Sequence, residues 1–263
     1  MGDLPPPARG LELQSVLGVS AHAGGHGSTD ELLAMCHLED GARVLEVGCG
    51  IGAGAVYLAR ERNCQVTAVD RSPQMIEWAK KRAAGAGVGY RIEFQVASVD
   101  RLPFDDGAFD VVVAESVLSF IDDKDGAIAE LVRVVKPGGR VGINETFWIT
   151  DPPAGRGTEV QQLGVELLSS EQWQALWEKT GLDPRDSRFY SIEAAEESKN
   201  LRRWLGWRCA LRIWWRGLGL RLRDGAAFRS LRAQLRAPAG LVDCLGYGLF
   251  VGEKQPARAR AAG

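Results

Sequence analysis

Apolar positions along the chain fall into short runs, and longer stretches with helical spacing separate them. Most of these runs are continuous, as in strands that are buried on both faces, and one alternates apolar with polar positions. They occupy residues 43–48, 64–70, 90–97, 109–117 and 140–148. Strands that alternate with helices are typical of a parallel sheet with helices on both faces. With right-handed crossovers, this alternation predicts a Rossmann-like, doubly wound α/β fold.

Helix starts and two further strands extend this pattern along the chain. The sequence S-x-x-E at Ser28 predicts a capping box, and the S-P pair at Ser72 is a strong helix start. Residues 185–194 and 244–254 have strand character and predict a sixth and a seventh strand. The sheet is therefore expected to be seven-stranded and mostly parallel.

These elements imply one core domain with an insertion. Residues 28–193 and 241–254 are expected to form the core. Residues 194–240 differ in composition and are expected to form a helical cap inserted before the last strand. Residues 1–27, which are rich in Gly, Pro and His, are expected to be a flexible N-terminal segment, and residues 255–263 a disordered tail.

Composition narrows the class of protein. The 263 residues are 45% hydrophobic and 25% charged, with a formal net charge of −2, as in ordinary soluble globular proteins, and no nucleic-acid binding is expected. The first residues contain no apolar signal core, and no apolar stretch reaches the roughly 18 residues of a membrane span. We therefore expect a cytoplasmic protein. The five cysteines are scattered without a C-x-x-C pair, so we expect free thiols and no metal site.

The segment VLEVGCGIGAG, residues 44–54, has glycine at four alternate positions. A strand that runs into such a loop and then into a helix brings bare backbone close to a ligand. One fitting ligand is a nicotinamide dinucleotide, because Gly50, Gly52 and Ala55 match a relaxed G-x-G-x-x-A fingerprint, and the other is S-adenosylmethionine (SAM). Asp70, about twenty residues on, can accept hydrogen bonds from the ribose hydroxyls of either ligand. A helix-capping role is the alternative for Asp70.

Three further features favour SAM over a dinucleotide. Glu46 lies in the strand before the first glycine, where a carboxylate would repel a pyrophosphate but suits a cationic amino-acid end. Residues 97–120 place an L-P-F segment and an acidic turn before a buried strand, and residues 130–145 join a helix to the fifth strand through a P-G-G turn. In this order the blocks resemble the class I SAM-dependent methyltransferases, especially the ubiquinone/menaquinone-type group that acts on small molecules. The resemblance covers roughly residues 28–147.

The resemblance implies which residues contact the cofactor. The glycine loop would lie beneath the methionine part, with Glu46 supporting the loop and the amino group, and Asp70 would hold the ribose hydroxyls. Arg71 and Met75 would flank the adenine, and the backbone of Val99 would contact its edge. The implied set of cofactor-binding residues is Glu46, Gly48, Gly50, Gly52, Asp70, Arg71, Met75, Ser98, Val99 and Glu115.

One position departs from the family's pattern. The family often has an aspartate four residues before the L-P-F segment, where it binds the adenine amino group. This chain has Ser98 there, with Asp100 two residues later. The adenine contact is therefore either a weaker hydroxyl bond from Ser98 or a bond moved to Asp100.

Methyl transfer from a sulfonium is an in-line displacement, so the enzyme supplies mainly alignment and desolvation. A general base is needed only when the acceptor must lose a proton. The candidate catalytic residues are Glu115 and Glu145, at the ends of the fourth and fifth strands, and His26. His26 lies with His22 in a glycine-rich segment that is expected to fold over the cofactor. A solvated loop position is the alternative for each histidine, and a strand-end salt bridge for Glu145. Asn144 is expected to line the pocket.

The sequence therefore predicts an enzyme that transfers a methyl group from SAM to a small-molecule or lipid-like acceptor. A SAM-binding sensor or partner subunit without catalysis is the alternative. It is supported by the absence of the aspartate that often binds the adenine, and the sequence also does not identify the general base. Whether the acceptor atom is carbon, oxygen or nitrogen stays open, as does the oligomeric state.

Residues 201–236 differ from the rest of the chain in charge. Ten arginines, no lysine and one acidic residue give this segment a formal charge of +9. Residues 201–224 have the pattern of an amphipathic helix with a tryptophan-rich arc beside a row of arginines. Three interpretations stay open: a cap helix that buries its tryptophans on the core, a helix (201–223) that contacts the inner face of the membrane, or arginines that pair with an anionic substrate group. We expect a cap that covers the active site and sets acceptor choice.

Overall fold

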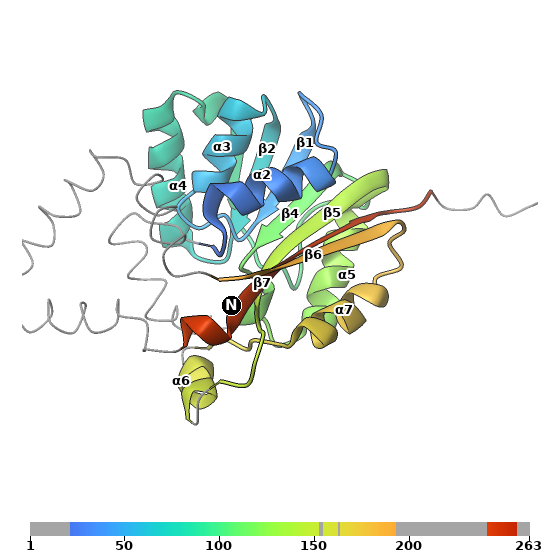
Figure 1. The fold of residues 1–263 in the computed structure, drawn as a ribbon. Helices are drawn as coiled ribbons and strands as arrows, with labels where there is room; N and C mark the ends of the chain where they lie inside the picture. Colours follow the sequence, from blue (N-terminus) through green and yellow to red (C-terminus); the bar gives the residue numbers. More distant parts are fainter. Residues whose placement is uncertain (1–21, 153–154, 163, 193–240, 257–263) are drawn as a thin grey trace, which may run out of the picture.

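A seven-stranded sheet forms the centre of the molecule in a computed structural model, which describes residues 22–152, 155–162, 164–192 and 241–256. The strands lie in the order β3-β2-β1-β4-β5-β7-β6 (Figure 1). This confirms the predicted Rossmann-like, doubly wound fold. The strands are β1 (Arg43–Val47), β2 (Gln65–Asp70), β3 (Ile92–Val96), β4 (Phe109–Glu115), β5 (Val135–Trp148), β6 (Arg185–Ser191) and β7 (Leu245–Glu253).

The strand order reverses at the centre of the sheet. From β1 the chain adds β2 and β3 on one side, and then returns to add β4 and β5 on the other, all in parallel. Strand β7 is antiparallel and lies between β5 and β6. In sheets of this kind the ligand crevice lies at the carboxyl ends of the strands where the order reverses. The topology therefore places the expected site beyond the ends of β1 and β4.

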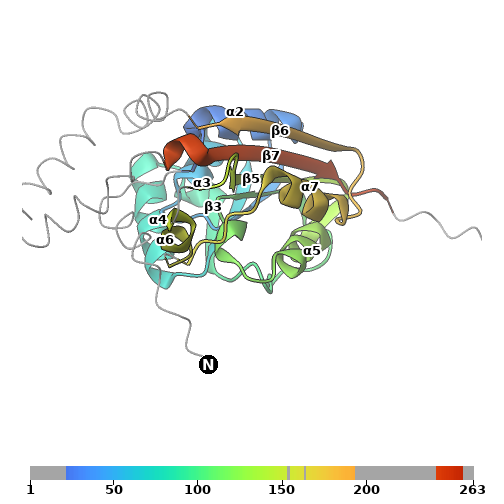
Figure 2. The same ribbon diagram turned by 60° about the horizontal axis from the view of Figure 1, so that its bottom comes forward.

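Helices cover both faces of the sheet, as Figures 1 and 2 show. One apolar cluster joins α2, α3 and α4 to one face, and a second joins α5 and α7 to the other. Short 3-10 turns follow β4 and precede β3 and β7. The helices and turns are α2 (Gly25–Met35), α3 (Ala53–Glu61), α4 (Pro73–Ala86), α5 (Lys124–Val134), α6 (Arg156–Gln162), α7 (Ser170–Glu178), η1 (Gly89–Arg91), η2 (Leu118–Phe120) and η3 (Val242–Cys244).

Close packing fixes α2 against the sheet. A Cβ atom on Gly142 of β5 would lie 2.7 Å from the Cys36 sulfur and 3.2 Å from a Leu32 methyl carbon, so a larger residue has no room there. Leu32 and Leu33 are fully buried in this contact. Burial of a leucine side chain contributes about 1.5–3 kcal/mol. The packing therefore anchors the helix that leads into the site.

Two of the predicted helix starts have different outcomes. The hydroxyl of Ser72 accepts a hydrogen bond from the Met75 N–H at 3.4 Å, which confirms the cap of α4. The capping box at Ser28 was wrong. The N-cap of helix α2 lies four residues earlier, at Gly24, which has a left-handed conformation, and the helix begins at Gly25. The Ser28 hydroxyl is buried and donates to the Ala23 carbonyl at 2.8 Å instead.

Several expectations concern residues outside the described part of the chain. The helical cap at 194–240, with its amphipathic helix, belongs there, as do most of the N-terminal segment and of the tail. Among the described helices, none is long and apolar enough to cross a membrane. The four cysteines in the described part of the chain are free thiols, and three of them are buried.

Candidate cofactor and active site

The glycine loop after β1 is tied to the end of β2. The N–H groups of Gly48 and Cys49 donate to the Val69 carbonyl at 2.8 and 2.9 Å. The N–H of Gly50 donates to Oδ2 of Asp70 at 2.9 Å. These bonds fix the loop beyond the sheet at the point where the strand order reverses, which is where the topology places a ligand.

The glycines of this loop serve different purposes. A Cβ on Gly48 would lie 2.3 Å from a Val117 methyl carbon, and a Cβ on Gly52 would lie 2.7 Å from the Cβ of Ala79 in α4. These two glycines allow close packing inside the protein. Gly50 has φ +51° and nothing within 4 Å of a Cβ position, so its open side faces free space. Gly50 is therefore where the backbone is open to a ligand.

Glu46 carries a buried carboxylate that is only partly satisfied. One hydrogen bond comes from the Ala55 N–H in the first turn of α3, while Oε2 is buried and accepts none from the described residues. Burial, and then the neighbouring Glu115, raises the pKa of Glu46 to about 8. An unpaired buried carboxylate needs a donor or a cation to offset its loss of water. The ammonium group of SAM has the chemistry that fits this position.

Asp70 lies at the end of β2 and is held by backbone. Its Oδ1 accepts the Ser72 N–H at 2.8 Å, and its Oδ2 accepts the Gly50 N–H at 2.9 Å. Burial raises the pKa of Asp70, although these two hydrogen bonds oppose the effect. Each carboxylate oxygen can accept a further hydrogen bond. The ribose contact stays a prediction, and the alternative that Asp70 caps the loop and α4 also has support in these bonds.

The residues expected around the adenine lie near the ends of β2 and β3. Met75 and Val99 are buried, whereas Arg71 is half-buried. The Ser98 hydroxyl donates to Oδ2 of Asp100 at 2.6 Å. The two alternatives for the adenine amino group, Ser98 and Asp100, are thus one hydrogen-bonded pair, in which the carboxylate keeps acceptor capacity.

A second polar cluster joins α2 to the ends of β4 and β5. The Thr29 hydroxyl lies 3.1 and 3.2 Å from the two carboxylate oxygens of Glu115. The Asn144 amide donates to Oε2 of Glu115 at 3.2 Å, and Nδ1 of His22 lies 3.4 Å from the same oxygen. Thr29 was not predicted as a site residue, because its partner Glu115 is distant in the sequence.

Both clusters border one small cavity. Its lining includes Glu46, Glu115, Thr29 and both histidines of the N-terminal segment, His22 and His26. Its volume is about 40 Å³. That is enough for one small polar group, but far below the roughly 300–1,000 Å³ of a site for a whole ligand. The cavity brings together Glu46, Glu115 and the two histidines, whereas Asp70, Arg71 and Glu145 do not line it.

His26 lies at the outer side of this cavity. It is exposed on α2, and its ring centroid lies 5.2 Å from that of Tyr57. Partial burial, and then the nearby His22, lowers the pKa of His26. The ion-pair distance to Glu115 belongs to His22. The predicted catalytic role of His26 stays a prediction, and the geometry favours His22 over it.

Glu145 does not line the cavity. Its carboxylate is fully buried and accepts the N–H groups of Val117, Leu118 and Ser119 at 2.8, 2.7 and 3.3 Å, and the Ser119 hydroxyl at 2.7 Å. Burial raises the pKa of Glu145 against these hydrogen bonds. The structure thus argues against Glu145 as a general base, and also against the alternative of a salt bridge. Glu145 holds the loop after β4.

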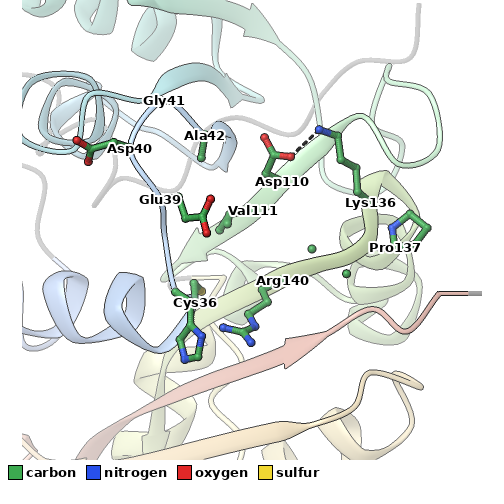
Figure 3. A pocket seen from close by; sticks show the side chains of 13 residues that line it. Cys36, Glu39, Asp40, Gly41, Ala42, Asp110, Val111, Lys136, Pro137 and Arg140 are labelled. Carbon is green, nitrogen blue, oxygen red and sulfur yellow. Dashed lines mark hydrogen bonds and ion pairs between the residues drawn. The ribbon is translucent and has the colours of Figure 1, made fainter.

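A larger hollow lies at the opposite edge of the sheet, where β1, β4 and β5 begin (Figure 3). Its volume is about 600 Å³. Lys136 pairs with Asp110 at 2.5 Å, and Arg140 pairs with Glu253 at 2.9 Å. These pairs involve Asp110, Lys136 and Arg140 of its walls, and the glycine loop lies at the other ends of the strands. The hollow was not predicted, and we assign it no ligand.

The comparisons with known proteins agree with this geometry. Residues 45–143 match the family model described as "Methyltransferase domain". The chain is 34% identical over 187 residues to 27-O-demethylrifamycin SV methyltransferase of Amycolatopsis mediterranei. The matched region covers 66% of this chain and 68% of that protein. It is 31% identical over 159 residues to phosphoethanolamine N-methyltransferase 1 of Arabidopsis thaliana. That match covers 60% of this chain but only 32% of the relative.

Solved structures share the fold at lower identity. The [4+2]-cyclase SpnF is 22% identical with a TM-score of 0.76, over 97% of this chain and 98% of that one. A SAM-dependent methyltransferase from Thiobacillus denitrificans in complex with S-adenosylhomocysteine is 22% identical with a TM-score of 0.70, over 97% and 100% of the two chains. At this identity the likeness shows the fold, and the fold carries more than one chemistry.

Proposed function

The chain belongs to the SAM-dependent methyltransferases, and from that premise we propose that it methylates a small organic acceptor bound beside Glu115 and His22. SAM is the cofactor of this family. The observation that carries the proposed site is the buried, half-satisfied carboxylate of Glu46, together with the open face of Gly50 in the loop that follows β1. A methyltransferase is favoured over a non-catalytic SAM-binding subunit, because the relatives are named as enzymes.

The residues divide the work of holding the cofactor. Glu46 would receive the ammonium group, the open backbone at Gly50 would lie against the cofactor, and Asp70 would accept the ribose hydroxyls. Met75 and Val99 would supply apolar contacts to the adenine. When bound, SAM supplies a methyl group that its sulfonium already makes electrophilic. The chain's own contribution is alignment of the acceptor and exclusion of water.

The identity of the acceptor belongs to this proposal. One relative is named for a rifamycin and another for phosphoethanolamine, so the family includes acceptors of unlike chemistry. The motif blocks of this chain resemble the ubiquinone/menaquinone-type group, which supports a small or lipid-like acceptor. Contact of residues 201–223 with the inner face of a membrane would bring the enzyme to such an acceptor, and this stays a proposal, as does a cytoplasmic location.

Calorimetry with S-adenosylhomocysteine tests the cofactor site. We expect the wild type to bind and Gly50→Ala to lose at least about tenfold in affinity, because a methyl group would fill the open face. Gly41→Ala is the matched control, since Gly41 also has a positive φ and nothing near its Cβ position, but lies before β1 at the other edge. Equal losses in both variants would show that strain, and not the site, is responsible.

Methyl transfer is tested with tritiated SAM and two probe acceptors of the kinds that the relatives' names print. 27-O-demethylrifamycin SV offers a hydroxyl group and phosphoethanolamine an amine. Label transfer to either one supports an enzyme and identifies the chemistry of the acceptor atom. A wild type that fails to bind S-adenosylhomocysteine or SAM would contradict the proposal as a whole.

A further inference from the structure

The glycine-rich segment that follows β1 ends in a fourth glycine, Gly54, in the first turn of α3. Unlike Gly48, Gly50 and Gly52, it does not have a positive φ, so alanine could adopt its backbone conformation. Glycine is also less favourable than alanine within a helix. Backbone conformation therefore does not explain why a glycine occupies this position.

The side chain of Glu46 fills the space where a Cβ atom of residue 54 would lie. Such an atom would overlap Oε1 of Glu46 and would lie 3.1 Å from its Cδ. The carboxylate therefore rests directly on the backbone of the first turn of α3. Only a residue without a Cβ atom leaves room for it there.

The other glycines of the segment have different neighbours. Gly48 and Gly52 make room for apolar side chains, and Gly50 has nothing within 4 Å of a Cβ position. Gly54 is the glycine of this segment whose neighbour is an ionisable side chain, that of Glu46. Both residues belong to the lining of the small cavity.

The position on α3 determines which part of the Glu46 carboxylate stays available. The group accepts a hydrogen bond from the Ala55 N–H, and the positive end of the helix dipole favours its negative charge. Oε2 is buried and accepts no hydrogen bond from the residues that the structure describes. The helix therefore holds one side of the carboxylate, and the other side is left for a donor.

We propose that Gly54 is a positioning residue for recognition of the cofactor's ammonium group, because it lets Glu46 rest on α3 with Oε2 available. This inference rests on the proposed function. It adds what the site distinguishes, which is an adenosyl compound with an amino-acid end from one without it.

Alanine at position 54 should displace the carboxylate and leave the helix in place. The atoms that collide are the end of a flexible side chain, whereas hydrogen bonds such as that from the Val56 N–H to the Gly52 carbonyl hold the helix backbone. The cavity beside the carboxylate has a volume of only about 40 Å³. A carboxylate that leaves α3 therefore takes up space that the ammonium group needs.

Calorimetry with two ligands tests the proposal. S-adenosylhomocysteine carries the amino-acid end, whereas 5′-methylthioadenosine keeps the adenosine and the sulfur but has a methyl group in place of that end. The wild type should bind S-adenosylhomocysteine about tenfold or more tightly than methylthioadenosine, as a hydrogen bond between charged groups implies. In Gly54→Ala, the affinity for S-adenosylhomocysteine should fall about tenfold, while that for methylthioadenosine should stay within about twofold.

Gly85→Ala is the matched control. Gly85 also lies in a terminal turn of a helix, is exposed on α4 and has nothing within 4 Å of a Cβ position, so both affinities should stay unchanged. An unchanged preference in Gly54→Ala, or an equal loss for both ligands, would overturn the inference and leave the cofactor site intact. A wild type that binds neither compound would contradict the proposed function and with it the inference.

Urea unfolding without ligand tests the geometry itself. Gly54→Ala is made in the wild type and in Glu46→Ala, where no carboxylate occupies the space. The substitution should raise the urea midpoint in Glu46→Ala, since alanine favours the helix, and should raise it less or lower it in the wild type. Equal changes in the two backgrounds would show that Glu46 and residue 54 do not compete for this space, and would overturn the inference.

Discussion

Binding of S-adenosylhomocysteine is predicted to release a proton from Glu46. The pKa of this buried carboxyl is about 8, so about nine-tenths of the molecules carry the proton at pH 7 without ligand. The ammonium group of the ligand favours the ionised form when it lies beside the unpaired Oε2. The carboxyl must then lose its proton as the ligand binds.

The size of the effect follows from this value. About 0.9 proton should leave per molecule bound at pH 7, and about 0.5 at pH 8, because half of the carboxyls are already ionised there. The ligand's own amino group is protonated before binding at pH 7, so it adds little. The decrease between pH 7 and pH 8 distinguishes Glu46 from a group with an ordinary carboxyl pKa, which would release nothing at either pH.

Titration calorimetry in phosphate and in Tris measures the release, because the two buffers take up protons with different enthalpies. The slope of the observed enthalpy against the ionisation enthalpy of the buffer gives the number of protons. Glu46→Gln is the control, since it keeps the shape of the side chain and has no proton to lose. A wild-type slope near zero at pH 7, or the same slope in Glu46→Gln, would refute the assignment.

Four further changes have expected outcomes. Glu46 keeps its proton longer in the folded state, so it should contribute a fall in the free energy of unfolding between about pH 4.5 and about pH 8. In urea unfolding this fall should be smaller in Glu46→Gln than in the wild type, and equal slopes would contradict the burial of the charge. Asp70→Ala should weaken S-adenosylhomocysteine binding by about 1–3 kcal/mol in calorimetry, and unchanged affinity would remove the ribose contact. Glu145→Ala leaves three N–H groups of the loop after β4 without their acceptor. The free energy of unfolding in urea should fall by about 3 kcal/mol or more. A fall below about 1 kcal/mol would argue against the role of Glu145 in holding that loop. Gly48→Ala should destabilise the fold by about 1–3 kcal/mol, because the added methyl group clashes with Val117. In thermal melts, adding Val117→Ala should restore part of the lost stability. No recovery would mean that the clash is not the cause.

The elements of the core could be predicted from sequence because their signals are local. Buried parallel strands appear as apolar runs, and the cap at Ser72 needs only residues within one turn of the helix. The same local rule failed at Ser28. There, the Asn144 amide, 116 residues away in sequence, donates to the hydroxyl, and the chain turns at Gly24 instead. Tertiary contacts overrode a correct local signal.

The site shows the same limit. The glycine loop and Glu46 were predictable because the ligand needs a strand, a bare loop and a helix in sequence order. The role of Glu145 was not, because its hydrogen-bond partners lie 26–28 residues earlier and nothing in the sequence marks them. The pairing of Thr29 with Glu115, 86 residues apart, exists only once α2 lies on the sheet.

The position of β7 constrains the order in which the molecule can be assembled during synthesis. Strand β6 has its only described strand partner in β7, which is translated more than fifty residues later. Tyr247 of β7 also approaches Gly24, at the start of α2. Until β7 leaves the ribosome, β6 lacks its neighbour and the turn before α2 lacks that contact. The nascent chain therefore has to keep these segments out of wrong pairings while the glycine loop and β1 to β5 can already fold.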